Sequence, residues 1–549
     1  MAVAIKELTF VSGFCLLTWV VLRKLLRGST LDSIPGPKAE SWWAGHLGQL
    51  FSFDAWDFHQ TIVEEYGGIV KLNSFFGGKA LYISDPLALH HVVVKQQHIF
   101  DKHPADYAIF NLMFGQGLLS TAGDPHRKQR KMLNPVFSTA HLRHMVPTFH
   151  GIAKQLRKII AENVVHGPQD IDMMHWLTHT ALELVGQAGL GVQFDLLHEG
   201  ATSPYADAIK CLGPVCFEHP VLLLLAPLMV KIGTPGFRRF VVEHAPFTVV
   251  QRMKEIADIM EQTSVDVYHS RLAALEKDGG ADDSFEDKSI LSILVKANMK
   301  ASLEDRLSEA EVIGQLTTLM FAAMDTTSSA LGRILHLLAQ NPTVQDRLRQ
   351  ELNEAVRDSD LSYDELDGLP FLDAICRETS RFYCTVPFTG RSAMEDTILP
   401  LSSPIKDVNG REMKEVFVPE GTRIYTGIMA ANRSKEIWGD DADQWKPERW
   451  LEPLPESVRG AHLPGVYSNM MTFLGGSRAC IGFKFAELEM KVVLANLVNA
   501  FRFTLSEKEA FWRMGLIVTP GVKGSRKPEP QLFLRVESID SHVEDCPLS

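Results

Sequence analysis

The chain has 549 residues and a formal net charge of −12, and 45% of its residues are hydrophobic. This much apolar material can fill a large core, which excludes a chain that is disordered overall. The acidic balance argues against nucleic acid as a partner, because binding a phosphate backbone requires clustered lysine and arginine.

The first predicted element is an apolar segment at residues 8–22, which is followed by Arg23, Lys24 and Arg27. It predicts a retained single-pass membrane anchor. A cleaved signal peptide is the alternative, but basic residues follow the run and no small-x-small cleavage site does. The basic residues on the C-terminal side predict that the folded body faces the cytosol. In a eukaryote this indicates the cytosolic face of the endoplasmic reticulum membrane.

We expect three regions along the chain: an anchor with a basic linker at residues 1–32, a folded domain at 33–540, and a polar tail at 541–549. Residues 68–85 predict two strands around a Gly77-Gly78 turn, which is a β-hairpin. Most of the remaining chain has the pattern of helices.

An apolar run at residues 221–230 is broken by Pro227 and is too short to span a bilayer. A buried core helix and a lipophilic surface that dips into a membrane both fit it. Further on, Ser308 with Glu311 forms a capping box and Asn341-Pro342 is a stop signal. These signals predict a helix of about 32 residues, about 48 Å long. Its centre is apolar on all sides, so we expect it to run through the core.

The seven cysteines contain no CxxC pair, so they indicate neither a disulfide framework nor a zinc site. Cys480 follows Gly475 and Gly476 and precedes a predicted helix. Loop amides and a helix N-terminus stabilise a thiolate at such a position. The glycines would allow a flat, bulky group to approach closely. The alternative is a buried structural cysteine.

The spacing Phe473-x-x-Gly476-x-Arg478-x-Cys480-x-Gly482 resembles the haem-binding signature of the cytochrome P-450 family. The resemblance implies a mainly α fold with a small β-rich subdomain, spread over residues 33–540. It also implies haem as the cofactor, these five residues as part of its site, and Cys480 as the axial ligand of the iron. A thiolate ligand pushes electron density onto the iron and favours O–O cleavage.

Two further motifs fit the same family. Glu378 and Arg381 resemble its ExxR pair, and Arg449 lies in a segment similar to its PERF sequence. The resemblance implies that the three form a buried charge network with a structural role. Considered alone, an acid and an arginine three residues apart on a helix are a common surface ion pair.

Asp325 and Thr326 lie at the centre of the long predicted helix, in a stretch similar to the family's AGxDTT sequence. The resemblance implies that Thr326 hydrogen-bonds dioxygen on the iron and that Asp325 relays protons. A purely local reading is the alternative, in which Thr326 bonds back to a carbonyl and Asp325 forms a salt bridge. Ala323 replaces the glycine that is usual in the family, which alters the expected shape of the pocket.

Three more cationic residues are implied to contact the haem propionates: His126, Arg130 and Arg391. His126 stands where the family has a tryptophan and shares a helix face with Arg130. An exposed basic helix, or a face that docks a reductase, is the alternative for residues 126–130. Residues 104–119, 385–389 and 517–520 are mostly apolar and are expected to surround a lipophilic substrate.

The resemblance, which is to fungal microsomal members, therefore implies a membrane-bound haem-thiolate monooxygenase. It would insert one atom of O2 into a lipophilic small molecule: a terpenoid, sterol, aromatic compound or other secondary metabolite. Its electrons would come from NADPH through a separate NADPH–cytochrome P-450 reductase. A haem-thiolate isomerase or dehydratase acting on a peroxide is one alternative. A non-catalytic haem-binding membrane protein is the other.

Overall fold

The computed structural model describes residues 29–218, 227–277, 289–355, 359–525, 527 and 529–539. The predicted anchor at residues 8–22 and the predicted tail at 541–549 lie outside them. Within the described ranges, no helix is both long enough and apolar enough to cross a membrane.

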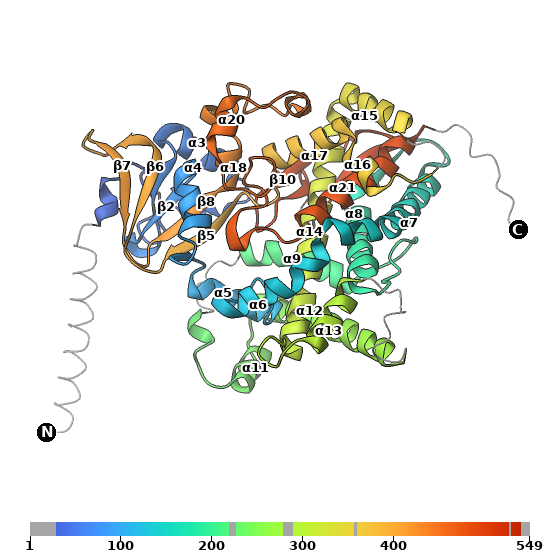
Figure 1. The fold of residues 1–549 in the computed structure, drawn as a ribbon, viewed down its shortest axis with the longest axis horizontal. Coiled ribbons are helices and arrows are strands. Elements are labelled where there is room, and N and C mark those ends of the chain that lie inside the picture. Colours follow the sequence, from blue (N-terminus) through green and yellow to red (C-terminus); the bar gives the residue numbers. More distant parts are fainter. Residues whose placement is uncertain are drawn as a thin grey trace, which may run out of the picture.

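Helices make up most of the molecule, as predicted (Figure 1). The described helices are α2 (Leu47–Leu50), α3 (Trp56–Tyr66), α4 (Pro86–His90), α5 (Pro104–Phe114), α6 (Gly123–Leu133), α7 (Thr139–Val164), α8 (Met173–Leu184), α9 (Pro204–Glu218), α11 (Pro235–Glu243), α12 (Thr248–Lys277), α13 (Ile290–Lys300), α14 (Glu309–Gln340), α15 (Pro342–Ala355), α16 (Tyr363–Asp367), α17 (Pro370–Phe382), α18 (Ile428–Asn432), α19 (Lys435–Trp438), α20 (Glu456–Ala461) and α21 (Phe483–Ala500).

The strands form small sheets, of which the largest has the order β1-β2-β8-β5-β3. Its strands are β1 (Ile69–Asn73), β2 (Lys79–Ile83), β8 (Arg423–Gly427), β5 (Phe388–Ala393) and β3 (Phe100–Asp101). The other sheets are β4-β12-β9, β6-β7 and β10-β11, made of β4 (Gln169–Asp172), β12 (Phe533–Ser538), β9 (Phe501–Leu505), β6 (Thr397–Lys406), β7 (Glu412–Val418), β10 (Ala510–Arg513) and β11 (Thr519–Val522). The predicted class, mainly α with a small β-rich part, is confirmed.

The predicted hairpin is confirmed and starts the largest sheet. β1 pairs antiparallel with β2, with Ile69 opposite Ile83 and Asn73 opposite Lys79. β8 then pairs parallel with β2 and antiparallel with β5, and β3 pairs antiparallel with β5. Because β3 and β5 are neighbours, Asp101 lies opposite Ser392, next to Arg391. Residues that are almost 300 positions apart therefore meet at one edge of this sheet.

The long helix is also confirmed. α14 has 32 residues, and Ser308 and Glu311 form the predicted capping box at its start. It runs through the middle of the molecule among α8, α12 and α21 (Figure 1). Its neighbours bury most of its residues, as expected for an apolar sequence without a polar face.

Two hydrophobic clusters meet at the loop that carries Cys480. The larger cluster fills the helical part and includes Phe485. The second cluster lies beside the largest sheet, and Phe473 and Phe483 pack against it. Ile481 packs against the helical cluster instead. The cysteine loop is therefore held at the boundary between the two clusters.

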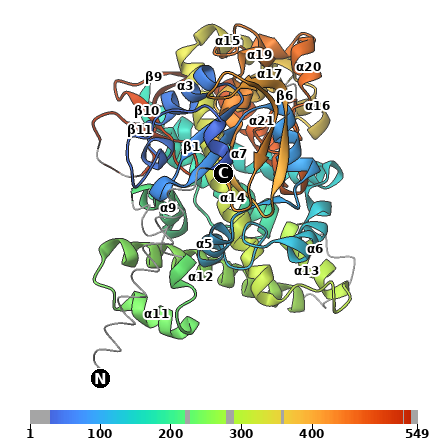
Figure 2. The ribbon, with the colours of Figure 1, turned by 90° about the vertical axis from the view of Figure 1, so that its left-hand side faces the viewer.

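The apolar run predicted at residues 221–230 is described only in part, because 221–226 lie outside the described residues. Leu228 and Met229, which follow, are exposed. Exposed apolar side chains continue into and beyond α11, namely Ile232, Phe237, Phe240, Val241 and Phe247. Two views place α11 at the edge of the molecule, below α5 and α12 (Figures 1 and 2). The described part of this run therefore favours an apolar surface over a buried core helix.

Candidate functional site

Cys480 lies in a short loop between the 3₁₀ turn Gly476–Arg478 and α21. Its backbone N–H donates to the carbonyl of Phe473 at 2.8 Å, which fixes the loop. Burial raises the pKa of its thiol, while a hydrogen bond from the Gly482 amide and the nearby Arg130 act in the opposite direction. Gly482 is the N-cap of α21, so the helix begins at Phe483, three residues after the cysteine.

A water-sized molecule can reach the Cys480 side chain, so it counts as exposed. Protein nevertheless surrounds it closely, and this surrounding protein is the largest cause of its raised pKa. Both facts hold when a side chain opens into a space inside the protein rather than onto the outer surface. An inert structural cysteine would instead be packed against apolar side chains, as Cys376 and Cys384 are. The accessible thiol therefore fits a ligand-binding role.

α14 presents a matching feature. From Gly314 to Ala339, all its residues are buried except Ala322, Ala323, Thr326 and Ala330, which are half-buried. These four lie on one face of the helix, since they are spaced by one, three and four residues. Accessible surface in the middle of a buried helix requires an internal space beside it. Thr326 is the polar member of this stripe, and the Ala323 methyl also belongs to it.

Two glycines of the cysteine loop lie against the backbone of other segments. Gly476 has a φ of 66°, and a Cβ built on it would lie 1.8 Å from the carbonyl oxygen of Val93. A Cβ on Gly475 would lie 1.7 Å from the carbonyl oxygen of Pro464. These two glycines therefore let the loop pack closely against other backbone segments.

Two of the predicted cations hold this loop in place. Arg130, on α6, donates to the carbonyl of Ala479 at 2.7 Å. Arg478 donates to the carbonyl of Thr121 at 3.0 Å. Both bonds use neutral acceptors, so neither guanidinium charge is neutralised by them. His126 is buried on the same helix as Arg130.

The predicted cations lie close enough to affect one another. Burial, followed by the charge of Arg478, lowers the pKa of Arg391 to about 10. Burial, with Arg478 and Arg130 nearby, lowers the pKa of His126 to about 3, so this histidine is neutral at neutral pH. Sequence reasoning missed Lys102, whose pKa burial and the two arginines Arg478 and Arg391 lower to about 7. Lys102 belongs to no sequence motif. It lies in the cluster because it directly follows β3, which pairs with the strand that carries Arg391.

This cluster provides a test of whether haem fits. Several buried cations face too few anions: Asp101 is the carboxylate within reach of Arg478, at 3.4 Å, and Asp106 is paired with Arg423 at 2.8 Å. A buried positive cluster is stable when anions join it. Haem brings two carboxylates, and the accessible Cys480 thiol can ligate its iron. The residues that are present therefore fit the group.

Asp325 and Thr326 make the contacts that a local reading predicts. Thr326 donates to the carbonyl of Ala322 at 2.7 Å. Asp325 accepts from Lys210 at 2.5 Å, and Lys210 also donates to Ser328 at 3.0 Å. These contacts alone do not distinguish a structural from a catalytic role. Thr326 is half-buried on the accessible face of α14. A threonine with only a structural role would not need this position.

Lys210 is a second residue that sequence reasoning missed. It comes from α9, and no spacing in the sequence relates it to Asp325. Both residues border a crevice with a volume of about 10 Å³, between α9 and the connection from β10 to β11. That volume is near the minimum for a single water molecule. Polar groups and room for water thus lie together on the flank of α14.

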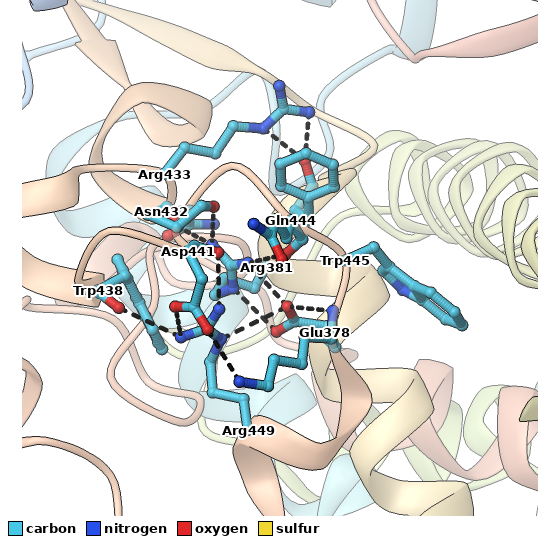
Figure 3. A network of polar contacts seen from close by, with 12 residues as sticks. Glu378, Arg381, Asn432, Arg433, Trp438, Asp441, Gln444, Trp445 and Arg449 are labelled. Carbon is cyan, nitrogen blue, oxygen red and sulfur yellow. Dashed lines mark hydrogen bonds and ion pairs between the residues drawn. The ribbon is translucent and has the colours of Figure 1, made fainter.

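The predicted charge network is present, and Figure 3 shows its members in contact. Arg381 donates twice to Glu378, at 2.7 and 2.9 Å, and both side chains have no exposed surface. Arg449 lies 3.5 Å from Glu378 but is bound more closely by Asp441, at 2.8 Å. Further partners of Arg381 and Glu378 are the carbonyls of Asn432, Ala442 and Gln444, which accept from Arg381, and the Lys446 amide and the Trp450 indole, which donate to Glu378.

The three segments expected around the substrate are connected to one another. Val518 donates its backbone N–H to the carbonyl of Thr385 at 2.8 Å, so the two walls meet. The Ser329 hydroxyl of α14 donates to the carbonyl of Val518. Beyond the end of α5, a Cβ on Gly117 would lie 2.2 Å from the carbonyl oxygen of Gly314, so the roof segment packs directly on α14.

Comparisons with known proteins agree with this arrangement. The family model described as cytochrome P450 matches residues 35–520. Cytochrome P450 monooxygenase 91 of Postia placenta is 48% identical over 531 residues, which are 95% of this chain and 98% of that protein. Monooxygenase 81 of the same fungus is 45% identical, with 96% of each chain covered. A protein named ganoderic acid synthetase, from Ganoderma lucidum, is 41% identical over 97% of this chain and 98% of its own.

Proposed function

From the premise that the chain belongs to the cytochrome P450 family, whose fungal monooxygenases it resembles over almost its whole length, we propose where it holds its cofactor and how its residues serve the reaction. It is a haem-dependent monooxygenase that uses dioxygen and reducing equivalents. Cys480 would be the residue that ligates the haem iron. The observation that carries this assignment is a thiol accessible from inside the protein, next to buried cations that outnumber the carboxylates near them.

Arg130, Arg391 and Arg478 would bind the two haem carboxylates, together with His126 as a neutral donor and Lys102 as a fourth cation. Their excess positive charge supports this role, because each carboxylate relieves repulsion among them. Phe473, Gly476 and Gly482 would shape the loop around the ligand. The Gly482 amide would stabilise the thiolate form of Cys480 by donating to its sulfur.

When bound, the haem supplies the activation of dioxygen and the transfer of one oxygen atom to the substrate. Thr326 would take part by turning its hydroxyl from the Ala322 carbonyl toward the internal space and holding a proton there. Asp325 would exchange protons with water in the crevice that it borders. Lys210 would hold the Asp325 carboxylate in place through their ion pair, at 2.5 Å. Glu378, Arg381 and Arg449 would support the haem-side core without touching substrate.

The substrate would be a lipophilic small molecule of the terpenoid, sterol or aromatic kind. The apolar roof at 104–119 and the walls at 385–389 and 517–520 support this class, because such side chains exclude water from the site. One relative's name, ganoderic acid synthetase, refers to an acid product of that protein. For this chain we propose the class only.

We also propose that the enzyme works at the endoplasmic reticulum membrane with its domain in the cytosol. The basic residues after the apolar segment at 8–22 and the exposed apolar surface from Leu228 to Phe247 support contact with lipid. Residues 33–540 would form the haem domain, between the anchor at 1–32 and the tail at 541–549. A separate NADPH–cytochrome P-450 reductase would supply the electrons.

The first test is the absorption spectrum of the reduced protein with carbon monoxide. Microsomal wild-type protein is compared with Cys480→His and with Cys384→Ala, a control that removes a buried thiol elsewhere. We expect a strongly red-shifted Soret band in the wild type and in the control, and a shifted or absent band in Cys480→His. A wild-type band at the position of histidine-ligated haem would remove Cys480 as the ligand.

A further inference from the structure

The first turn of the roof helix α5 is tied to the cation cluster by one hydroxyl group. Tyr107 donates to Asp101 at 2.5 Å and accepts a hydrogen bond from Arg478. Arg478 also reaches Asp101, at 3.4 Å. The Tyr107 hydroxyl therefore uses both its donor and its acceptor capacity to join α5 to Arg478.

The other contacts of this turn strengthen the connection. The Lys102 ammonium lies 4.7 Å from the Phe110 ring centroid and 5.7 Å from that of Tyr107, within range of a cation–π interaction. Asp106, the neighbour of Tyr107, pairs with Arg423 of β8. The start of α5 is thus held by polar contacts to the sheet and to the cations.

The opposite end of the roof is held in a different way. Phe114 packs on Phe321 of α14 with ring centroids 4.7 Å apart, and the Leu118 amide donates to Gln315 at 3.1 Å. These contacts do not involve the cations. Among the described contacts, those between α5 and Arg478 are at the start of the helix, while Lys102 also donates to the Leu119 carbonyl near the other end of the roof, at 2.8 Å.

We propose that Tyr107 is a positioning residue that couples occupancy of the cofactor site to the position of the roof helix. This inference rests on the proposed function, in which Arg478 binds a haem carboxylate. A carboxylate on one side of the guanidinium fixes its plane, and the fixed guanidinium then holds Tyr107 and Asp101 on its other side. The loaded site thereby keeps α5 closed over the substrate space.

Tyr107→Phe tests this proposal, because it removes the hydroxyl and keeps the ring over which Lys102 lies. Tyr205→Phe is the matched control: Tyr205 is buried on α9, and its hydroxyl has no hydrogen-bond partner among the described residues. Both variants and the wild type are purified as full-length holoenzymes. Three properties are measured: hydrogen exchange of the 104–114 peptides, release of haem to apomyoglobin, and the spectral binding of imidazole and of clotrimazole, a bulky imidazole.

In Tyr107→Phe we expect about ten-fold faster exchange in 104–114, the size of one charge-assisted hydrogen bond, and several-fold faster haem release. Clotrimazole should bind several-fold more weakly, while imidazole, too small to reach the roof, binds as in the wild type. Tyr205→Phe should match the wild type throughout. Unchanged exchange and unchanged clotrimazole affinity in Tyr107→Phe would overturn the coupling.

The same samples separate this inference from the proposed function. If the reduced carbon monoxide spectrum of wild-type protein lacks the thiolate-type Soret band, the cofactor assignment fails and the coupling fails with it. If the band is normal in all three proteins, the cofactor assignment stands. If hydrogen exchange of 104–114 and clotrimazole binding are then unchanged in Tyr107→Phe, Tyr107 has no coupling role.

Discussion

Glu489 is a buried carboxyl group that the site does not use. It lies on α21 with no exposed surface, and neither oxygen has a hydrogen-bond partner in the described part of the chain. Burial raises its pKa well above the usual value, and the nearby Thr327 side chain, which makes no hydrogen bond to it by distance and angle, opposes this shift only in part. The folded protein therefore keeps this proton to a higher pH than the unfolded chain does.

We predict that Glu489→Gln stabilises the protein at neutral pH, by about 1–3 kcal/mol, because a neutral amide avoids the cost of burying an unpaired charge. The sign follows from linkage. A raised pKa costs stability as the pH rises above the unfolded value of about 4.3, so the gain is small near pH 4 and full above the folded pKa. Thermal unfolding at several pH values measures it.

Glu487→Gln is the matched control on the same helix, because Glu487 is paired with Lys491 at 3.0 Å. Burial raises the pKa of Glu487 as well, but Lys491 opposes the shift, so this substitution should stabilise the protein less than Glu489→Gln does. Equal shifts for the two variants would contradict the assignment of Glu489 as an unpaired carboxyl.

Lys210 gives a second prediction at the scale of single residues. Lys210→Met strands the buried charge of Asp325, and breaking a buried pair costs about 3–5 kcal/mol. We expect a lower unfolding temperature, with most of the loss recovered in the double variant Lys210→Met with Asp325→Asn. A double variant as unstable as the single one would show that the pair is not the cause.

Single residues also show the limit of prediction from sequence. Cys480, Glu378 and Arg381 were found because their neighbours along the chain form motifs. Lys102 and Lys210 were missed because each reaches its partners from a distant segment, and nothing local marks the meeting. The contacts of Thr326 and Asp325 were foreseen, but only the burial pattern of α14 showed that Thr326 borders an internal space.

At the scale of elements, α14 connects the site to its surroundings. Its capping box and its length were predictable, because both signals are local. Its packing against the roof depended on Gly314 meeting Gly117, which no local pattern indicates. The existence of the helix therefore followed from the sequence, whereas its role as a platform for the roof followed from tertiary contacts.

We predict that Gly314→Ala displaces the roof. A Cβ at this position would lie 2.6 Å from the Gly117 nitrogen, so the backbone must move, at a cost of about 1–3 kcal/mol. Clotrimazole binding should weaken while imidazole binding is kept. In Gly151→Ala, on α7, the new Cβ meets no atom within 4 Å and helix propensity should add up to about 1 kcal/mol. Similar unfolding temperatures for both variants would contradict this packing.

At the scale of the whole molecule, the network around Glu378 and Arg381 joins α17 to the segment before the cysteine loop. We predict that Glu378→Gln lowers stability by about 3–5 kcal/mol and speeds haem loss, because Arg381 is left buried with its charge unpaired. The control is Arg347→Ala, which breaks a half-exposed pair with Glu448 and should cost at most about 1 kcal/mol. Thermal unfolding and the Soret absorbance measure both effects.

The exposed apolar surface around α11 leads to a prediction for membrane contact. Phe237→Asp with Phe240→Asp should weaken binding to phosphatidylcholine vesicles several-fold in protein that lacks residues 1–28, because two apolar side chains are lost from the surface. Phe76→Asp, which changes an exposed phenylalanine outside this segment, is the control. Equal vesicle binding by all three proteins would show that this surface does not contact lipid.

The contact of Gly476 with the Val93 carbonyl has a consequence for biosynthesis. Ribosomes make the chain from its N-terminus, so Val93 is synthesised long before Gly476. The contact between these two residues can form only when most of the chain has been made. At typical elongation rates this delay is on the order of a minute. The cysteine loop cannot close while the chain is still short, so we expect haem to be inserted after translation is nearly complete.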